Sequence, residues 1–332
     1  MRTLKLITVI FLLVALLLAG CAAVGGSGAS SGTATRPAVE DKPISVVATV
    51  FPAYDWARQI LGADNDRVAL TLLLDKGTDF HNYQPTVEDI YKISTCDLFI
   101  YVGGESDGQW VPDALAQATN PNQRVVCLLD ALGSAARTEA PLEGMEPEDE
   151  EEDAYDEHVW LSLRNAAALC AVIQKALQGI DPQGGEAYQK NLEVYREKLE
   201  ALDAAYAAAV AAAPRRELLF ADRFPFRYLA EDYGLSCWAA FSGCSAETEA
   251  SFKTVNFLVN KADELGLAHI LVLDSSDTRL AETIIANSRN KDADVLRLNS
   301  LQAVTARDVE NGVSYVGVME ENLEVLKTAL GG

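Results

Sequence analysis

The sequence predicts an α/β protein with two similar lobes, each a roughly four-stranded parallel sheet flanked by helices, joined by one long rigid helix. Its 332 residues, at about 100 to 200 residues per domain, favour two domains with separate cores. Short apolar, β-branched runs alternate with helical patterns along most of the chain, which is typical of parallel sheets. A long stretch rich in Ala, Leu, Glu and Lys separates two sets of these runs.

Eight apolar runs are predicted as strands, four in each lobe. In the first lobe they lie at residues 44–50, 68–74, 97–102 and 124–129. In the second lobe they lie at residues 217–221, 235–240, 269–273 and 294–298. Because the two sets have the same number and character, we expect two sheets of similar design.

Helix signals lie between these strands. Pro52, which follows an apolar run, is expected in the first turn of one helix, and Gly62 follows the expected end of that helix. Thr86 and Asp89 have the spacing of a capping box. Both features predict helices that cover the first sheet.

The segment 181–214 is predicted to be the connecting helix. It has no proline between Pro182 and Pro214, and its apolar residues recur at steps of three and four: Tyr188, Leu192, Tyr195, Leu199, Leu202 and Tyr206. A helix of about 30 residues is about 45 Å long at 1.5 Å per residue. The domains are therefore expected at 44–180 and 215–332, with this helix between them.

The first residues have the layout of an export signal. Arg2 and Lys5 precede an uncharged apolar run at 6–18, which is shorter than the roughly 20 residues that span a bilayer. A transmembrane anchor is the alternative. The run ends in Leu-Ala-Gly before Cys21, which resembles the lipobox of bacterial lipoproteins.

The lipobox resemblance implies a location for the mature protein. Residues 1–20 would be a signal peptide, and Cys21 would carry the lipid that anchors the chain to the extracytoplasmic face of the cell membrane. Residues 21–43 are rich in Gly, Ser, Ala and Thr, a composition that forms a flexible linker. We therefore expect a lipid-anchored, extracytoplasmic protein.

Composition and charge exclude several classes of protein. Residues of the AVILMFWYC set make up 49% of the chain, which argues for a folded body and against a disordered or multi-spanning protein. The net charge of −22 repels phosphate backbones, so we expect no nucleic-acid partner.

Five cysteines follow Cys21, at positions 96, 127, 170, 237 and 244. An odd number leaves at least one free thiol, and no CxxC spacing indicates a thiolate metal site or a redox pair. Most are expected to be small core residues. A bridge between Cys237 and Cys244 is left open.

The segment 143–157 is predicted to be an acidic mobile loop. Ten of its fifteen residues are Asp or Glu, and it lacks aliphatic periodicity. A solvated loop that aids solubility and a loop that attracts cations are both compatible with this composition.

Polar residues at the predicted strand ends form a candidate metal site. His81 follows the second strand, and His158 follows the fourth strand and the acidic loop; Asp222, Asp274 and Asn299 end strands of the second lobe. Ligands bind at the carboxyl ends of parallel strands. Neutral imidazole is a preferred ligand of Zn²⁺ and similar metals. Two histidines at strand ends make metal binding as plausible as the alternative, in which each is an isolated capping or exposed residue.

The third histidine, His269, opens an apolar strand and is expected to be a packing residue.

Six segments of the chain resemble one known family. They are TVFPAYDWARQILG (49–62), HNYQPTVEDIYKI (81–93), DLFIYVGG (97–104), DEHVWLSLRNA (156–166), FRYLAEDYGL (226–235) and SYVGVMEENLEVLKTAL (314–330). They are similar to the zinc and manganese solute-binding lipoproteins of ABC importers, called cluster A-I. The resemblance implies a helical-backbone metal receptor that is not an enzyme and that works as a monomer with an ABC permease and its ATPase.

The resemblance also implies a ligand set. His81 and His158 match the first two metal ligands of the family. The third ligand position falls on Arg223, which cannot bind a metal while protonated, so Asp222 is the expected substitute, with helix capping as its alternative role. The fourth position falls on Asn299. Asp274, Glu247 and Glu249 are reserve oxygen donors, for which capping and solvated roles are the alternatives.

Zinc is the expected cargo. Two imidazoles and one carboxylate suit tetrahedral Zn²⁺, whereas Mn²⁺ favours more oxygen donors, although a manganese receptor stays an alternative. A receptor for a metal chelate such as a siderophore or haem is a second alternative, because Arg223, Arg227 and Trp238 could line its pocket.

Catalysis and adhesion have less support. An exported zinc hydrolase would need a metal-bound water and a base, but the sequence lacks HExxH, GxSxG and a P-loop. No residue supports a surface adhesin.

In the zinc branch of the family that this chain resembles, a His- and acid-rich loop separates the first two ligands. Here 143–157 has that place but no His, so we expect it to collect cations weakly.

Overall fold

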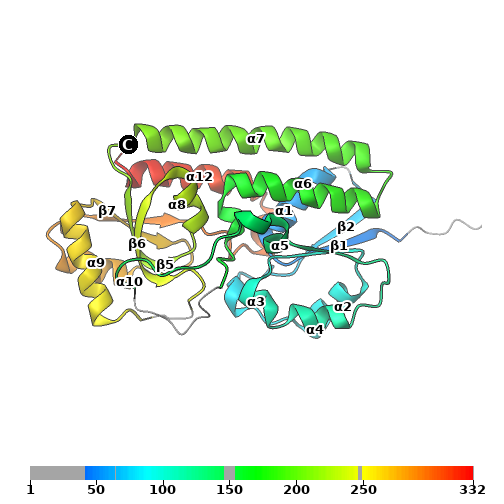
Figure 1. The fold of residues 1–332 in the computed structure, drawn as a ribbon, viewed down its shortest axis with the longest axis horizontal. Coiled ribbons are helices and arrows are strands. Elements are labelled where there is room, and N and C mark those ends of the chain that lie inside the picture. The colour runs from blue at the N-terminus through cyan, green and yellow to red at the C-terminus, as the bar shows by residue number, and fades with distance from the viewer. Residues whose placement is uncertain (1–41, 64, 146–153, 246–248, 332) are drawn as a thin grey trace, which may run out of the picture. The chain divides into compact units, whose positions relative to one another are not determined.

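The computed structural model describes residues 42–63, 65–145, 154–245 and 249–331. Residues Pro43–Gly332 form one compact unit. It contains two four-stranded parallel sheets flanked by helices, with a long helix that spans both, as Figure 1 shows. The predicted fold class is confirmed. The predicted signal peptide, Cys21, the centre of the acidic loop and Glu247 lie outside the described residues.

The two sheets have the same strand order. The first has the order β2-β1-β3-β4 and the second β6-β5-β7-β8, with every neighbouring pair parallel. The strands are β1 Ile44–Ala48, β2 Val68–Leu72, β3 Leu98–Tyr101, β4 Arg124–Cys127, β5 Glu217–Phe224, β6 Ser236–Ser242, β7 His269–Leu273 and β8 Asp294–Leu298. We call the first sheet with its loops the N-lobe and the second the C-lobe. The loops at their carboxyl ends are the expected ligand positions.

The helices of the N-lobe include the two that carry end signals in the sequence. They are α1 Phe51–Leu61, α2 Val87–Thr95, α3 Gly104–Gly108, α4 Val111–Ala116, α5 Leu128–Leu132 and α6 Leu163–Ile180, with 3₁₀ turns η1 Phe80–Asn82, η2 Gly133–Ala135 and η3 Val159–Leu161. Pro52 lies in the first turn of α1, and Gly62 ends it with φ +84°. Thr86 and Asp89 form the predicted capping box of α2.

The connecting helix is α7, Gly185–Ala212, with 28 residues, or about 42 Å at 1.5 Å per residue. All six apolar residues of the predicted stripe are buried. The remaining helices are α8 Arg227–Tyr233, α9 Phe252–Leu265, α10 Arg279–Asn287, α11 Ala306–Glu310 and α12 Tyr315–Ala329. Among the described residues, none of the helices combines the length and the apolar character that crossing a membrane requires.

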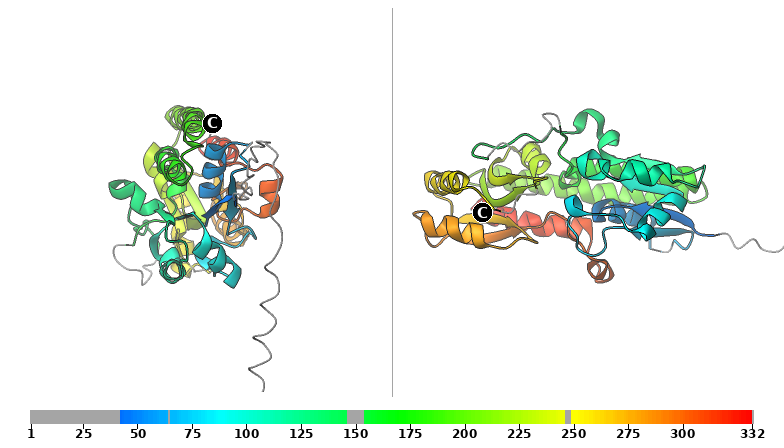
Figure 2. Two further views of the ribbon diagram at one scale, coloured as in Figure 1. Left: turned by 90° about the vertical axis from the view of Figure 1, so that its right-hand side faces the viewer. Right: turned by 90° about the horizontal axis from the view of Figure 1, so that it is seen from below.

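The last helix, α12, returns to the N-lobe. It packs against both α7 and α1, and the red α12 lies against the blue α1 in the views of Figure 2. Its first residue, Tyr315, meets Trp56 of α1 edge to face, with 5.3 Å between ring centroids. The hydroxyl of Tyr315 donates to the Trp160 carbonyl at 2.6 Å, and its backbone N–H donates to Asp55 Oδ2 at 2.8 Å.

The core therefore differs from the two separate cores that chain length favoured. One cluster of buried apolar side chains includes residues of both sheets, from Val46 to Leu330, and a smaller cluster lies around α9 and α10. Apolar periodicity identifies the buried face of a helix but not the element it packs against, so the return of α12 was not visible in the sequence.

Candidate metal centre

His81 lies in the turn η1, after β2. Asp79 fixes this turn, because its Oδ1 accepts a hydrogen bond from the His81 backbone N–H at 3.0 Å. The ring nitrogen Nδ1 of His81 is 2.8 Å from Ser106 Oγ, and Ser106 Oγ donates to Glu157 Oε2 at 2.6 Å. Since the hydroxyl proton goes to the carboxylate, Ser106 Oγ accepts from Nδ1–H. The lone pair of His81 is therefore on Nε2.

His158 precedes the turn η3 and is fully buried. Asp156 Oδ1 accepts from the His158 backbone N–H and from its ring Nδ1, both at 2.9 Å. A carboxylate only accepts, so His158 also carries its proton on Nδ1 and its lone pair on Nε2. Burial lowers the pKa of His158, but the charge and hydrogen bond of Asp156 outweigh burial, so this pKa lies above its ordinary value.

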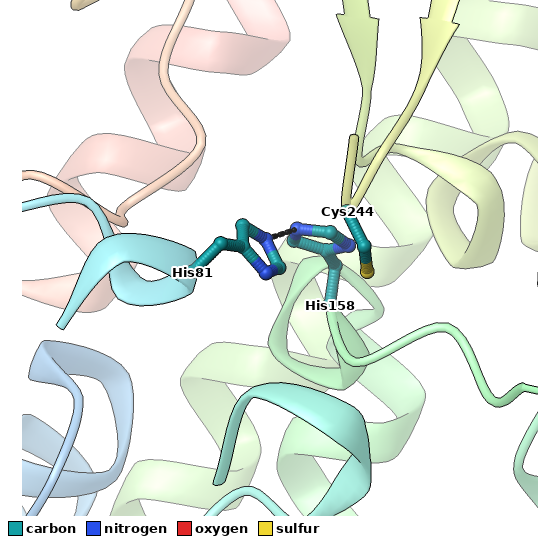
Figure 3. A group of neighbouring side chains, drawn as sticks. All are labelled: His81, His158 and Cys244. Atoms are coloured by element: carbon teal, nitrogen blue, oxygen red, sulfur yellow. Dashed lines mark hydrogen bonds between the residues drawn. The ribbon is translucent and has the colours of Figure 1, made fainter. Parts of the chain in front are cut away.

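The two rings point toward one another. The Nε2 atoms of His81 and His158 are 3.0 Å apart, as the dashed line in Figure 3 shows. Two lone pairs at this distance repel unless a proton or a metal cation joins them. Ligand nitrogens at a tetrahedral zinc ion are about 3.3 Å apart, given Zn–N distances of about 2.0 to 2.1 Å. The spacing of the two ring nitrogens is therefore compatible with a cation bound between them.

Cys244 places a third side chain of a metal-binding type beside this pair, and sequence reasoning missed it. Its Sγ and one nitrogen from each ring all lie within 4.8 Å of one another (Figure 3). The thiol is free, as is Cys237, so the structure contains no bridge between them. Burial raises the pKa of the Cys244 thiol, and the nearby carboxylates of Glu139, Glu157 and Asp156 add to this effect.

Gln302 is a further residue that sequence reasoning missed. It is buried in the loop after β8, and its Nε2 lies 3.1 Å from His81 Nε2. Because the oxygen and nitrogen of an amide exchange places by a half-turn, the side chain offers either a donor or an acceptor to the site. Its position three residues after Asn299 is a weak sequence signal, since many polar residues follow strand ends.

The structure does not bring Asp222 into the group of His81, His158 and Cys244. Asp222 lies within β5, which extends past the predicted end and has an irregular register between Phe220 and Arg223. Its Oδ1 accepts from the Arg223 backbone N–H at 2.8 Å and its Oδ2 from the Leu273 N–H at 2.9 Å. The carboxylate thus joins β5 to β7.

Asn299 is likewise held by the backbone. Its Oδ1 accepts from the Leu301 N–H at 2.8 Å, and its own N–H donates to Asn322 Oδ1 at 2.8 Å. This turn places Leu301 in the left-handed region, with φ +62°. Asn299 therefore shapes the loop that carries Gln302.

Arg223 pairs with the N-lobe. Its Nη2 is 2.5 Å from Asp79 Oδ2, and both side chains are largely buried. Burial raises the pKa of Asp79, but the ion pair and hydrogen bond with Arg223 outweigh it and hold the pKa below its ordinary value. The same carboxylate thus fixes the His81 turn and contacts the C-lobe.

The other predicted oxygen donors have separate positions. Asp274 accepts from the Ser300 N–H at 3.2 Å, and burial raises the pKa of its carboxyl. Glu249 is exposed. His269 opens β7, at the end of the strand opposite the site, and is half-buried.

A cleft of about 470 Å³ lies beside the candidate centre. Asn82 of the N-lobe and Ser245 of the C-lobe line it, and they are the chain neighbours of His81 and Cys244. Asp222 and Arg223 line it as well. The cleft therefore lies next to the two loops that carry His81 and Cys244.

Two equivalent parallel sheets, a shared long helix and a buried histidine pair at the strand ends define a two-lobed receptor with a candidate metal centre. The family model described as zinc-uptake complex component A, periplasmic, matches residues 46–329. The chain belongs to this family.

Individual relatives agree with this assignment. The zinc-binding lipoprotein AdcA of Streptococcus pneumoniae is 32% identical over 295 residues, which are 86% of this chain and 56% of that protein. The chain thus spans about half the length of this relative. The high-affinity zinc uptake system protein ZnuA of Bacillus subtilis is 30% identical over 315 residues, 92% of this chain and 93% of that one.

Solved structures show the same fold. The Zn(II)-bound ZnuA-like domain of S. pneumoniae AdcA superposes with a TM-score of 0.69 at 29% identity, covering 88% of this chain and all of that one. The metal-dependent lipoprotein YcdH of B. subtilis gives a TM-score of 0.70 at 27% identity, over 86% of this chain and 98% of that one.

Proposed function

We propose that this protein captures Zn²⁺ between its lobes and delivers it to an ABC permease. His81 and His158 are the proposed N-lobe ligands. The observation that carries the proposal is the pair of Nε2 atoms 3.0 Å apart, each bearing a lone pair because a hydrogen-bonded partner holds the proton on Nδ1. Fixing the tautomer in this way is the usual function of carboxylates around metal-bound histidines.

Zinc is proposed over manganese because the ring nitrogens are borderline donors. Imidazole suits Zn²⁺, whereas carboxylates and waters suit Mn²⁺. Asp222, the oxygen donor expected from the sequence, already accepts two backbone hydrogen bonds. The pneumococcal and Bacillus relatives are named as zinc-binding and zinc-uptake proteins, which supports the same choice.

Location and partners belong to the same proposal. The sequence of residues 1–21 supports export and lipid attachment at Cys21, and the pneumococcal relative is named a lipoprotein. We propose that the protein is tethered as a monomer outside the cytoplasm, where it transfers zinc to a permease driven by an ATPase.

We propose that the protein has no catalytic activity. A zinc hydrolase needs a coordinated water and a base beside it. The nearest carboxylates, Asp156 and Glu157, already orient the two rings, directly and through Ser106. Their contacts are those of groups that position ligands.

Zinc titration of three histidine variants tests the proposal. His81→Ala and His158→Ala should each weaken Zn²⁺ binding at least tenfold, about 1.4 kcal/mol, in a competitive titration with a chromogenic chelator. His269→Ala is the matched control, because His269 lies at the opposite end of its strand, and it should bind as the wild type does. Elemental analysis of protein purified without added metal, followed by Zn/Mn competition, checks the metal.

Wild-type affinity in both site variants would remove the histidine pair from the site and overturn the proposal. Manganese in the purified protein, with tighter Mn²⁺ than Zn²⁺ binding, would replace the zinc receptor by a manganese receptor.

A further inference from the structure

The loop after β6 brings Cys244 to the histidine pair. β6 ends at Ser242, so Gly243 and Cys244 lie at the carboxyl end of a C-lobe strand. In the part of the chain that the structure describes, His81, His158 and Cys244 form the one cluster of three His, Cys, Asp or Glu side chains positioned to share a metal ion. Figure 3 shows Cys244 beside the His158 ring, on a different chain segment from either histidine.

Two contacts hold this loop against the site. Glu139 Oε1 accepts from the backbone N–H groups of Gly243 at 2.5 Å and of Cys244 at 3.3 Å. A Cβ at position 243 would lie 2.9 Å from His158 Cε1 and 2.9 Å from the Phe224 carbonyl oxygen. Only glycine lets the backbone approach the ring so closely. The hydrogen bonds from Glu139 and the close approach of Gly243 to the His158 ring together hold the loop that carries Cys244.

We propose that Cys244 Sγ is the third zinc ligand, which gives a His₂Cys donor set drawn from both lobes. The inference rests on the proposed zinc function and extends it to a donor from the C-lobe. Zinc accepts sulfur at about 2.3 Å and nitrogen at about 2.0 to 2.1 Å, so the Sγ and a ligand nitrogen would lie about 3.5 Å apart. The Sγ and one nitrogen of each ring now lie within 4.8 Å of one another, and zinc binding through the two Nε2 atoms would require the Cys244 side chain to rotate toward them.

Thiolate ligation has a consequence for metal choice. Zinc replaces the thiol proton, which leaves to solvent, and the Sγ binds as thiolate. A thiolate is a soft donor that favours Zn²⁺ over the harder Mn²⁺. Cys244 would therefore supply the selectivity that two histidines and an oxygen donor provide only weakly.

Cobalt-loaded protein gives a direct spectroscopic test. A thiolate bound to Co²⁺ produces an intense charge-transfer band in the near ultraviolet, whereas imidazole and oxygen ligands alone do not. The wild-type protein should show this band, and Cys244→Ser should lack it. Cys237→Ser is the matched control, because Cys237 is a free, half-buried thiol on β6, the strand that precedes Cys244, and it should retain the band.

Affinity measurements separate this inference from the proposed function. Cys244→Ser should weaken Zn²⁺ binding at least tenfold and change Mn²⁺ binding less than twofold. A retained cobalt band and wild-type zinc affinity in Cys244→Ser, together with weakened binding in the histidine variants, would overturn the cysteine ligand and leave the receptor standing. Wild-type affinity in the histidine variants would overturn the receptor itself.

Alkylation of the wild-type protein keeps the test valid if Cys244→Ser fails to fold. Iodoacetamide should modify Cys244 at least tenfold more slowly with Zn²⁺ than without it, measured by mass spectrometry of the peptide, while Cys237 reacts at an unchanged rate. Equal protection factors for the two cysteines would contradict the proposal.

Discussion

Asp156 and Glu157 are neighbours in the chain, yet they orient different rings. Asp156 holds His158 directly, and Glu157 holds His81 through Ser106. Glu157 Oε1 also accepts from the Ser106 backbone N–H at 2.7 Å, which fixes the hydroxyl between ring and carboxylate. One short segment before His158 therefore aligns both proposed zinc ligands.

Ser106 provides the residue-scale prediction. In Ser106→Ala the hydrogen bond to His81 Nδ1 is lost, and the nearest remaining acceptor is Glu157 Oε2 at 3.4 Å. Since contacts of this kind typically contribute 10-fold to 100-fold to metal affinity, zinc binding should weaken about tenfold in a chelator competition.

Ser94→Ala is the matched control for this experiment. Ser94 is also largely buried, but its hydroxyl donates to the Tyr91 carbonyl within α2, so zinc binding should be unchanged. An equal loss in both variants would mean that Ser106 acts through general stability and not through the orientation of His81.

The residues of the site were predictable to different degrees. His81 and His158 follow strand ends, where topology alone directs polar side chains into one region. Cys244 also follows a strand, but an isolated cysteine resembles a core residue, and the close approach of Gly243 depends on tertiary contacts. Whether Asp222 and Asn299 bind metal stays a prediction, since neither sequence nor spacing shows which backbone groups a carboxylate or amide satisfies.

Asp181 stabilises the junction between α6 and α7. It is buried, and its carboxylate accepts from Arg67 Nη2 and Nε and from the Tyr188 hydroxyl at 2.7 Å. Burial raises the pKa of Asp181, but the hydrogen bonds of Tyr188 and Arg67 outweigh it, so the pKa lies below its ordinary value of 3.8. The turn between the two helices thus depends on a charged carboxylate.

Asp181→Asn should lower the free energy of unfolding by about 1 to 3 kcal/mol at pH 7, as expected for hydrogen bonds to a charged group. A lowered pKa in the folded state means that the stabilisation is complete above the pKa of the unfolded chain and is lost as pH falls. Urea titrations should therefore show the difference between variant and wild type shrinking below about pH 3.8.

Asp292→Asn, at an exposed position before β8, is the control and should change stability little at any pH. A pH-independent loss in Asp181→Asn would show that packing, and not the charge of the carboxylate, holds the junction.

Elements with strong local signals were predictable, and contacts between distant elements were not. The stripe of α7 and the capping box of α2 are properties of consecutive residues. The extension of β5 to Phe224 depends on pairing with β6 across a register irregularity. Strand pairing of this kind is set by neighbours in the sheet, which the strand's own residues do not identify.

Asp79 and Arg223 join the lobes beside the candidate metal centre. The pair is largely buried, with exposed side-chain fractions of 20% and 16%, whereas the pair of Arg137 and Glu231 is 45% and 49% exposed. Water screens an exposed pair far more than a buried one. The first pair should therefore contribute more to holding the two lobes together.

A double-mutant cycle tests this difference in metal-free protein. Arg223→Met with Asp79→Asn should give a coupling energy of about 1 to 3 kcal/mol in urea unfolding. Arg137→Met with Glu231→Gln should give about 0 to 1 kcal/mol, the range of exposed pairs. A coupling for Asp79 and Arg223 no larger than that of the exposed pair would contradict an electrostatic connection between the lobes.

The position of Tyr315 has a consequence for biosynthesis. Trp56 belongs to α1, the first helix of the described residues, and its aromatic neighbour Tyr315 belongs to α12, the last of them. About 260 residues separate the two helices along the chain. The hydrophobic core of the N-terminal half therefore cannot form completely until α12 has been synthesised. The nascent polypeptide should remain protease-sensitive until its final segment emerges.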